Sequence, residues 1–315
     1  MKTLEFRNGD KLDAIGLGTW KSDKGKVEEA VYTALKTGYT HIDCALVYGN
    51  EKEVGNGIHK ALYEGIITRK DLWVTSKLWN NAHRREDVIP ALKKSLKDLQ
   101  LDYLDLYLMH WPVAFKSGLE GFPQGDDDYL SLDEVPIIET WDAMLEAKKQ
   151  GLVKHVGVSN FSKKKLKDLM SKTDDNPEMN QVELHPLLRQ DDLLDFCHKN
   201  NIHLTAFSPL GSGDRTPEMK ADDEPDMMGN ETVKNIAEKH QCTSAQVLIA
   251  FHLHRDTAVI PKSTNADRIK ENLESAEIKF DDQDLKTLKS LDKHYRYVNG
   301  KFFENNSKYT NIYDD

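Results

Sequence analysis

The sequence predicts an α/β fold: a (β/α)8 TIM barrel with an N-terminal β-hairpin, two extra helices and long loops at the C-terminal mouth. Eight short strand-like runs alternate with amphipathic helical stretches, which is the pattern of a parallel sheet. The length of 315 residues suits one large barrel, and 38% hydrophobic residues suffice for its core. Because no linker or low-complexity tract interrupts the pattern, we expect residues 1–315 to form a single domain.

The strands are expected in order along the chain, after a hairpin over residues 4–12 with a tight Asn8-Gly9 turn. Each is a short run rich in aliphatic and β-branched residues that ends near polar residues. Eight such runs, each leading into a helix, favour a closed barrel over an open sheet. The expected strands are Ile15–Thr19, His41–Cys44, Leu72–Leu78, Leu104–His110, Val153–Ser159, Asn180–Leu184, His203–Ser208 and Ala258–Pro261.

The helices between the strands show apolar residues at helical spacing. One face collects five apolar residues between positions 27 and 35, and Gly38 is placed to end that helix. The same spacing recurs over residues 88–99 and 137–145. Two later helical stretches, 244–252 and 284–291, are expected to be the extra helices.

The charge and cysteine content exclude several classes of protein. With 53 acidic and 43 basic residues the net charge is −10, which argues against nucleic acid or an anionic membrane as the main partner. No apolar run approaches the ~18 residues of a membrane span, and residues 1–11 lack the apolar stretch of a secretory signal. The three cysteines are widely spaced and odd in number, which fits a reducing compartment. We therefore expect a cytoplasmic protein.

Four polar residues lie at or just after the ends of neighbouring strands: Asp43, Tyr48, Lys77 and His110. Each alone has a structural explanation, such as a helix cap, packing, a Lys77–Asp43 ion pair or a core histidine. Together they should surround one mouth, where barrel active sites lie. A Lys77 ammonium held by Asp43 is expected to lower the pKa of Tyr48 from its usual ~10, and His110 to donate to a carbonyl oxygen. The set suits protonation of a carbonyl oxygen during reduction.

From end to end, the chain resembles the aldo-keto reductases, and especially their aldehyde and aldose reductase branch. The resemblance implies an NADPH-dependent barrel reductase, monomeric, with Asp43, Tyr48, Lys77 and His110 as the catalytic tetrad and Tyr48 as proton donor. Eight motifs in the family's order carry the resemblance: Gly16–Trp20, Ile42–Glu51, Ser76–Trp79, His110–Pro112, Gly157–Phe161, Asn180–Glu183, Ser208–Gly211 and Ile260–Ser263.

The resemblance also implies where NADPH or NADP+ binds, with NADH as the weaker alternative. Ser159, Asn160 and Gln181 match residues that hold the nicotinamide carboxamide, and Phe207 replaces the tyrosine that stacks on the ring. Lys21 and Asp214 match a pair that closes the loop 212–229 over the pyrophosphate. A Lys, a Ser and an Arg near a helix N-terminus suit a 2′-phosphate. The matching adenosine-end residues are Lys262, Ser263, Asn265, Arg268, Glu271 and Asn272, and Thr19, Trp20, Asp43, Ser208, Leu210 and Ser212 complete the predicted cofactor site.

The substrate implied by the resemblance is an aldehyde: an aldose, or an aromatic or aliphatic aldehyde, with some ketones possible. The tail over residues 296–303 is expected to close the outer side of the pocket. Two long segments, 117–136 and 212–229, follow strands and hold twelve acidic and two basic residues, equal to the whole net charge. Their field should disfavour anionic substrates. The predicted substrate pocket comprises Tyr48, His110 and an aromatic wall of Trp20, Trp79, Trp111, Phe115 and Phe122.

Three other interpretations have less support in the sequence. A regulatory subunit on the same barrel would bind the cofactor without turnover, but the complete tetrad favours turnover. A short-chain dehydrogenase would use the Tyr48–Lys52 spacing, yet residues 16–21 lack the third glycine of its dinucleotide fingerprint. No metal site is expected, because His252 and His254 are two apart on a helix and their rings diverge; a solvated face explains them better.

Overall fold

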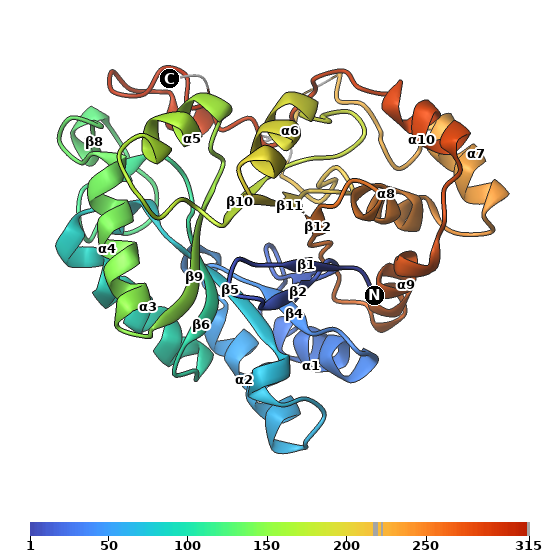
Figure 1. Cartoon of the computed structure of the whole chain (residues 1–315), viewed down its shortest axis with the longest axis horizontal. Coiled ribbons are helices and arrows are strands. Elements are labelled where there is room, and N and C mark those ends of the chain that lie inside the picture. The colour runs from blue at the N-terminus through green and yellow to red at the C-terminus, as the bar shows by residue number, and fades with distance from the viewer. Residues whose placement is uncertain (217–219, 222, 314–315) are drawn as a thin grey trace.

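The eight predicted strands form one parallel sheet, in the order β12-β11-β10-β9-β6-β5-β4-β3, in a computed structural model that describes residues 1–216, 220–221 and 223–313 (Figure 1). The barrel closes where the Gly16 N–H donates to the Val259 carbonyl at 2.9 Å and the Val259 N–H donates to the Ala14 carbonyl at 2.7 Å. The predicted (β/α)8 barrel is therefore confirmed. Its strands are β3 (Leu17–Gly18), β4 (His41–Asp43), β5 (Trp73–Leu78), β6 (Leu104–Met109), β9 (Val153–Ser159), β10 (Met179–Glu183), β11 (His203–Phe207) and β12 (Ala258–Val259).

The helices surround the sheet and bury the apolar faces read from the sequence. In α1 the five predicted apolar residues are all buried, and Gly38 ends the helix at φ +111°, a value that glycine adopts without strain. Side chains of Ser162, Asn230, Thr243, Asn265 and Asp281 cap later helices. The helices are α1 (Val27–Thr37), α2 (Glu51–Tyr63), α3 (Arg85–Leu99), α4 (Ile137–Lys149), α5 (Lys163–Met170), α6 (Asp191–Lys199), α7 (Glu231–Lys239), α8 (Ser244–Leu253), α9 (Ala266–Glu274) and α10 (Asp282–Lys289).

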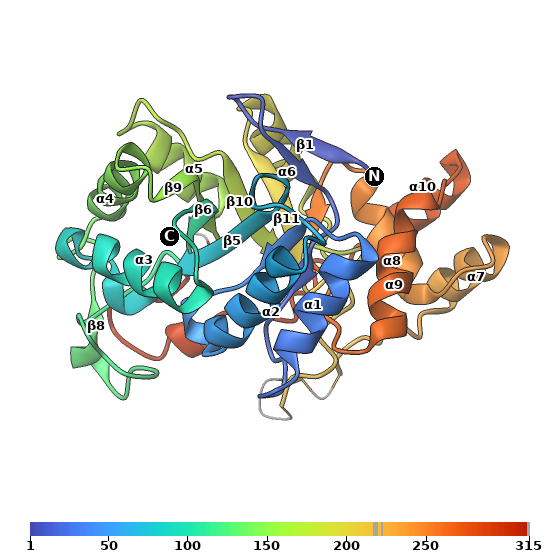
Figure 2. The ribbon, with the colours of Figure 1, turned by 90° about the horizontal axis from the view of Figure 1, so that it is seen from below.

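The described residues contain two helices beyond those of the barrel repeats, of which α10 was predicted and α7 was not. Helix α8, expected to be additional, packs against β12 and α9 and so takes the place of a connecting helix of the barrel. The second extra helix is α7, which packs on α10 at one side of the molecule (Figure 2). Residues 246–253 of α8 are all buried, so His252 is a core residue. The expectation of a solvated face for His252 was wrong, because this helix is surrounded by protein on every side.

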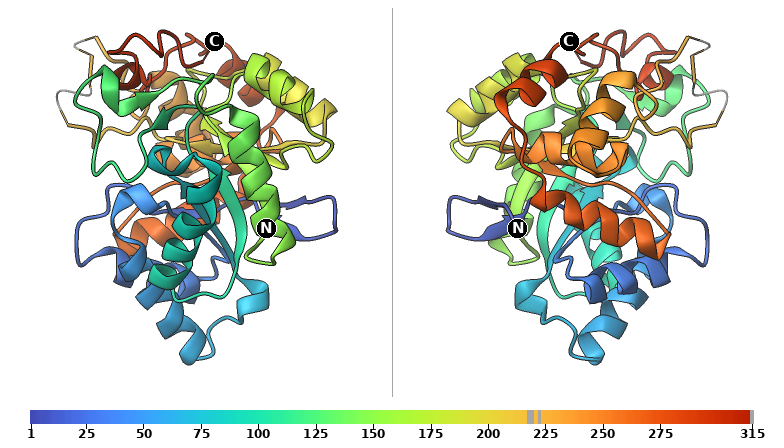
Figure 3. Two further views of the ribbon diagram at one scale, coloured as in Figure 1. Left: turned by 90° about the vertical axis from the view of Figure 1, so that its left-hand side faces the viewer. Right: turned by 90° about the vertical axis from the view of Figure 1, so that its right-hand side faces the viewer.

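The N-terminal hairpin closes the end of the barrel away from the active-site loops. Strands β1 (Thr3–Glu5) and β2 (Lys11–Asp13) pair antiparallel, as predicted. Leu4, Phe6 and Leu12 cluster with Trp73 and with residues of the barrel interior. Figure 3 shows the hairpin on one side and the segment around β8 on the other.

The mouth carries the two acidic segments and the C-terminal tail. Part of the first segment is regular, since β8 (Tyr129–Leu130) pairs antiparallel with β7 (Ala114–Phe115). The Lys308 ammonium of the tail donates to the Tyr129 carbonyl at 2.7 Å and lies 3.2 Å from the Glu134 carboxylate. The first segment therefore also docks the tail. In the second segment, Glu218 and Asp222 lie outside the described residues.

No helix in the described part of the chain is both long enough and apolar enough to cross a bilayer.

Candidate active site

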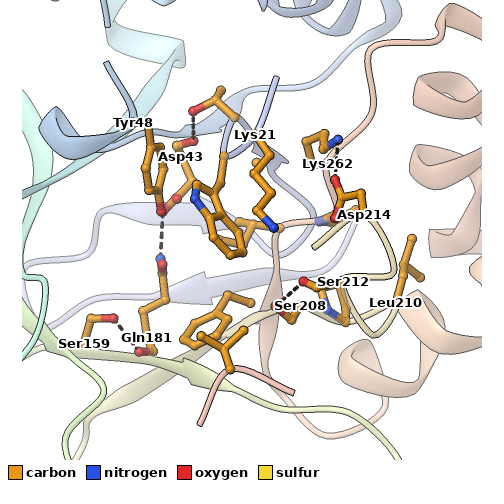
Figure 4. Close-up of a pocket in the computed structure, with 18 of the residues that line it drawn as sticks. Lys21, Asp43, Tyr48, Ser159, Gln181, Ser208, Leu210, Ser212, Asp214 and Lys262 are labelled. Carbon is orange, nitrogen blue, oxygen red and sulfur yellow. Dashed lines mark hydrogen bonds and ion pairs between the residues drawn. The ribbon is translucent and has the colours of Figure 1, made fainter. Parts of the chain in front are cut away.

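A cavity of about 600 Å³ opens at the carboxyl ends of the barrel strands (Figure 4). Polar residues from β4, β9 and β10, together with Tyr48 and His110, form its floor, and apolar residues from the loops and the tail form its wall. This is the mouth at which the sequence placed the catalytic residues.

The four predicted catalytic residues do meet at this floor. The Lys77 ammonium, at the end of β5, lies 2.5 Å from the Asp43 carboxylate and donates to the Tyr48 hydroxyl at 3.3 Å. The Tyr48 and His110 rings lie edge to face with centroids 5.8 Å apart. Lys77 and Asp43 are almost completely buried, so each supplies the partner that the other needs.

Asp43 is held in place by more than Lys77. Its second carboxylate oxygen accepts from the Gln181 amide at 2.7 Å, and its carbonyl accepts from the Thr19 hydroxyl at 2.9 Å (Figure 4). Gln181, a predicted cofactor residue on β10, is therefore hydrogen-bonded directly to the ion pair on β4 and β5. The Lys77 ammonium also donates to the Cys44 carbonyl at 2.9 Å, which fixes its direction.

Burial sets the ionisation of the floor. Burial raises the pKa of Tyr48 to about 12, although the nearby Lys77 ammonium acts to lower it. The expected net lowering of this pKa was wrong, because removal from water disfavours the phenolate more than one cation stabilises it. Burial acts to lower the pKa of Lys77, but Asp43 raises it overall. Tyr48 is thus a neutral phenol and Lys77 a charged ammonium.

His110 is neutral as well. Burial lowers its pKa well below the usual value, and the Lys77 charge adds to this effect. Its Nδ1 atom is buried and has no hydrogen-bond partner among the described residues. The Trp79 ring packs edge to face on the imidazole at 5.3 Å. A neutral imidazole in this position has one N–H to donate and carries no charge to repel the ammonium beside it.

Most of the predicted cofactor residues line the cavity, and four do not. Ser263, Asn265, Glu271 and Asn272 are not among the lining residues: Asn265 caps α9, and Glu271 lines a separate surface pocket with His240 and Cys242. The residues that do line the cavity are Thr19, Trp20, Lys21, Asp43, Ser159, Asn160, Gln181, Phe207, Ser208, Leu210, Ser212, Asp214, Lys262 and Arg268.

Asp214, the acidic member of the predicted loop-closing pair, is paired with Lys262 in this structure. Asp214 lies 2.8 Å from the Lys262 ammonium, whereas the buried Lys21 ammonium has no hydrogen-bond partner among the described residues. Lys21 lies over the Trp20 ring, 4.4 Å from its centroid, and burial lowers its pKa. Three cations, Lys21, Lys262 and Arg268, therefore face one end of the cavity.

The apolar wall matches the prediction except at Phe115. Trp20, Trp79, Trp111 and Phe122 line the cavity, while Phe115 lies behind Trp79 and supports it edge to face at 5.9 Å. The tail contributes Val298 and Phe302, as its predicted closing role requires. Val47 and Met228 also line the cavity.

Two buried charged residues near the site were missed. Glu183 and Arg215 are 0% and 4% exposed, and both bind the backbone of the tail. Glu183 is a charged residue between Val182 and Leu184 in a predicted strand, which is the kind of signal that identified Lys77. Arg215 gave no such signal, because it lies in an irregular loop and its partner is 82 positions away.

A model of the Aldo/keto reductase family matches residues 14–293. The chain belongs to the aldo/keto reductase family. It is 46% identical to an aldo/keto reductase of Synechocystis sp., covering 100% of this chain and 97% of that protein. It is 45% identical to aldo-keto reductase family 1 member A1 of Mus musculus, covering 93% and 90%. The aldose reductase of Schistosoma japonicum superposes with a TM-score of 0.89 at 36% identity, covering 98% of both chains.

Family membership makes this aldo/keto reductase an oxidoreductase of carbonyl groups. It also decides against the short-chain dehydrogenase interpretation. The ammonium within reach of the Tyr48 hydroxyl is that of Lys77, on a barrel strand, and not that of Lys52.

Proposed function

We propose that this aldo/keto reductase reduces aldehydes to alcohols with NADPH, and that Tyr48 donates the proton. One observation carries the proposal: a neutral Tyr48 hydroxyl lies 3.3 Å from a buried ammonium in the floor of an apolar-walled cavity. Relatives in this family named aldo-keto reductase family 1 member A1 and aldose reductase support the reaction class.

The residues of the cavity fit a nicotinamide cofactor. At the floor, the buried Asn160 side-chain oxygen has no partner among the described residues and can accept from an amide. At the other end, Lys21, Lys262 and Arg268 supply positive charge for phosphate groups. Phe207 lines the cavity between these ends and offers a face on which a ring can stack. A bound nicotinamide supplies the hydride.

The side chains of the cavity floor bind and protonate the carbonyl oxygen of the substrate. Tyr48 donates a hydrogen bond to this oxygen, and the neutral His110 donates a second one that orients it and stabilises developing negative charge. As the carbonyl carbon gains the hydride, Tyr48 transfers its proton to the oxygen and becomes a phenolate. Lys77, fixed by Asp43, stabilises this phenolate until a solvent proton restores it.

The wall favours an aldehyde with an apolar body. Four aromatic side chains of the loops, with Val298 and Phe302 of the tail, surround the space above Tyr48. The lining cations Lys21, Lys262 and Arg268 belong to the cofactor end. We therefore propose neutral aromatic or aliphatic aldehydes as substrates, with aldoses and some ketones as weaker ones.

The test is NADPH consumption with purified protein against aromatic, aliphatic and sugar aldehydes and ketones. Oxidation of NADPH coupled to alcohol formation is the expected result, with a slower rate for NADH. Tight NADPH binding without turnover of any carbonyl compound would favour the regulatory subunit instead. Absence of NADPH binding would contradict both.

We also propose that the protein is a cytoplasmic monomer. Sedimentation of the purified protein should give one species near 36 kDa. A stable dimer would contradict the monomer.

A further inference from the structure

Arg215 joins two segments around the active site, its own loop and the C-terminal tail, although it does not line the cavity. Its guanidinium donates to the Ser212 carbonyl at 3.1 Å, within the loop that lines the cofactor end. It donates to the Tyr297 carbonyl of the C-terminal tail at 2.7 Å. It also forms an ion pair with Glu224, on the far arm of the same loop, at 2.5 Å. At 4% exposure, Arg215 has exchanged water for these partners.

The tail is held at the same residue from the barrel side. The Tyr297 and Val298 N–H groups donate to the two carboxylate oxygens of Glu183, at 2.6 and 2.7 Å. Glu183 lies two positions after Gln181 on β10, so both side chains point to the same side of the strand. The peptide of Tyr297 is thus clamped between a rigid strand and Arg215.

Tyr297 adds side-chain contacts to this clamp. Its hydroxyl donates to the Pro225 carbonyl at 2.6 Å, and its ring lies 5.3 Å from the Arg215 guanidinium. The ring also packs against Gly211, where an added Cβ would lie 3.3 Å from it. Glycine at this position therefore allows the loop and the tail to approach closely.

The clamped residue directly precedes the substrate wall. Val298 is the next residue and lines the cavity, and Phe302 lines it four positions later. On the loop side, Ser212 and Asp214 line the cofactor end and immediately precede Arg215. One buried side chain therefore joins the backbone of the cofactor end to the backbone of the substrate wall.

We infer that Arg215 is a positioning residue that couples occupancy of the cofactor end to the order of the substrate wall. A ligand that contacts Ser212 and Asp214 fixes Arg215, and Arg215 fixes the tail at Tyr297. By linkage, a substrate that contacts Val298 and Phe302 stabilises the bound cofactor by the same factor. The inference rests on the proposed function only in taking NADPH as the ligand of the cofactor end.

The first test is hydrogen–deuterium exchange of peptides from residues 296–304, with and without saturating NADPH. In the natural protein NADPH should slow exchange about fivefold or more. In Arg215→Met, which keeps the side-chain length but lacks the donors, the NADPH-dependent slowing should disappear. Arg215→Lys keeps a cation facing Glu224 and should restore part of it.

The matched control is Lys220→Met, which removes a cation of the same loop that donates to the Gly213 carbonyl. This variant should retain the NADPH-dependent slowing. Tyr297→Phe, which loses only the bond to Pro225, is expected to fold even where Arg215→Met does not, and to show a weakened effect. Equal slowing by NADPH in all four variants would overturn the inference.

The second test separates positioning from general damage by comparing a long aldehyde with a short one. Hydrocinnamaldehyde is long enough to reach the wall, and its Michaelis constant should rise about fivefold relative to that of acetaldehyde in Arg215→Met. Equal changes for both aldehydes would mean that Arg215 is merely structural. NADPH binding followed by tryptophan fluorescence distinguishes the two proposals: binding without tail protection overturns the coupling alone, whereas no binding overturns the proposed cofactor as well.

Discussion

Tyr48 combines two opposing effects on one hydroxyl group. Burial raises its pKa to about 12, which keeps the proton on the phenol, and the Lys77 ammonium at 3.3 Å stabilises the phenolate once the proton leaves. An exposed tyrosine would neither hold its proton as firmly nor have its phenolate stabilised as strongly by a nearby ammonium. The residue is therefore suited to give a proton at neutral pH and to take it back in the reverse reaction.

Tyr48→Phe removes the proton donor and little else. We expect kcat for aldehyde reduction to fall by about 10²- to 10⁴-fold, the usual contribution of a positioned general acid. The Kd for NADPH should stay within about twofold, because the ion pair and the cation end remain intact. Tyr63→Phe, at a tyrosine that is 86% exposed, is the matched control and should be fully active. Full activity of Tyr48→Phe would rule out its role as donor.

The raised pKa also predicts the pH dependence. Reduction needs the protonated phenol, so its rate should not fall from ionisation of Tyr48 until the pH approaches about 12. Alcohol oxidation needs the phenolate, so its kcat/KM should rise about tenfold per pH unit below that pKa. His110 stays neutral and Lys77 charged over this range. The measurement is kcat/KM in both directions from about pH 6 to about pH 10; a reduction rate that falls with an apparent pKa near 7 would contradict it.

At the scale of elements, the first turn of α9 shapes the cation end of the cavity. Asn265 caps the helix by accepting from the Arg268 N–H at 3.0 Å, which places Arg268 at the helix N-terminus beside Lys262. A helix N-terminus and two cations favour a dianionic phosphate. Of the two nicotinamide cofactors, only NADPH carries one at its 2′ position.

Arg268→Ala should therefore weaken the binding of NADPH more than the binding of NADH. Loss of a charge-assisted hydrogen bond costs about 1.5–3 kcal/mol, or about 10- to 150-fold in the Kd of NADPH. Both dissociation constants can be measured by nicotinamide fluorescence. Lys270→Ala, two residues further on the same helix and paired with Glu274, is the control and should change neither. Equal losses for both cofactors in Arg268→Ala would show that the 2′-phosphate is held elsewhere.

The elements differ in how far they follow from the sequence. Strand β9 has the predicted bounds, and α1 ends at Gly38 as predicted, because local pattern and tertiary burial agree there. Strands β3 and β12 are shorter than predicted. Helix α7 was overlooked even though Val233, Ile236 and Ala237 show helical spacing after the Asn230 cap. The partners of Lys21, Asp214 and Arg215 could not be predicted, because they depend on which loops meet at the mouth. Phe115 was misassigned because position after a strand does not say whether a ring faces the cavity or lies behind it.

At the scale of the whole molecule, the barrel depends on close contact at the seam between β3 and β12. Gly18 lies at this seam, and a Cβ added there would come within 2.6 Å of the Ile260 carbonyl oxygen. Gly18→Ala should lower the free energy of unfolding by about 1–3 kcal/mol, as overpacking usually does. Urea denaturation measures this. Gly125→Ala is the control, because Gly125 has extended backbone and open space around it, and this variant should leave stability nearly unchanged. Equal stability of both variants would mean that the seam can widen at no cost.

The distribution of the net charge over the molecule predicts substrate selection. In the sequence the two acidic segments together account for −10, and their described parts lie at the mouth. Among the described residues, Asp214 pairs with Lys262, Glu224 with Arg215 and Glu134 with Lys308. At saturating NADPH and low salt, para-carboxybenzaldehyde should be reduced with a lower kcat/KM than benzaldehyde. Its kcat/KM should rise toward that of benzaldehyde as salt shortens the Debye length, about 10 Å at 0.1 M.

The uncharged aldehyde should respond little to salt, because the field of the acidic segments acts only on the charged substrate. Replacing Asp127 and Asp133 of the first segment by Asn should narrow the difference between the two aldehydes at low salt. The same change should leave kcat for benzaldehyde unaltered, since neither residue lines the cavity. A preference for the carboxylated aldehyde at low salt would show that local contacts in the pocket outweigh the field of the whole molecule.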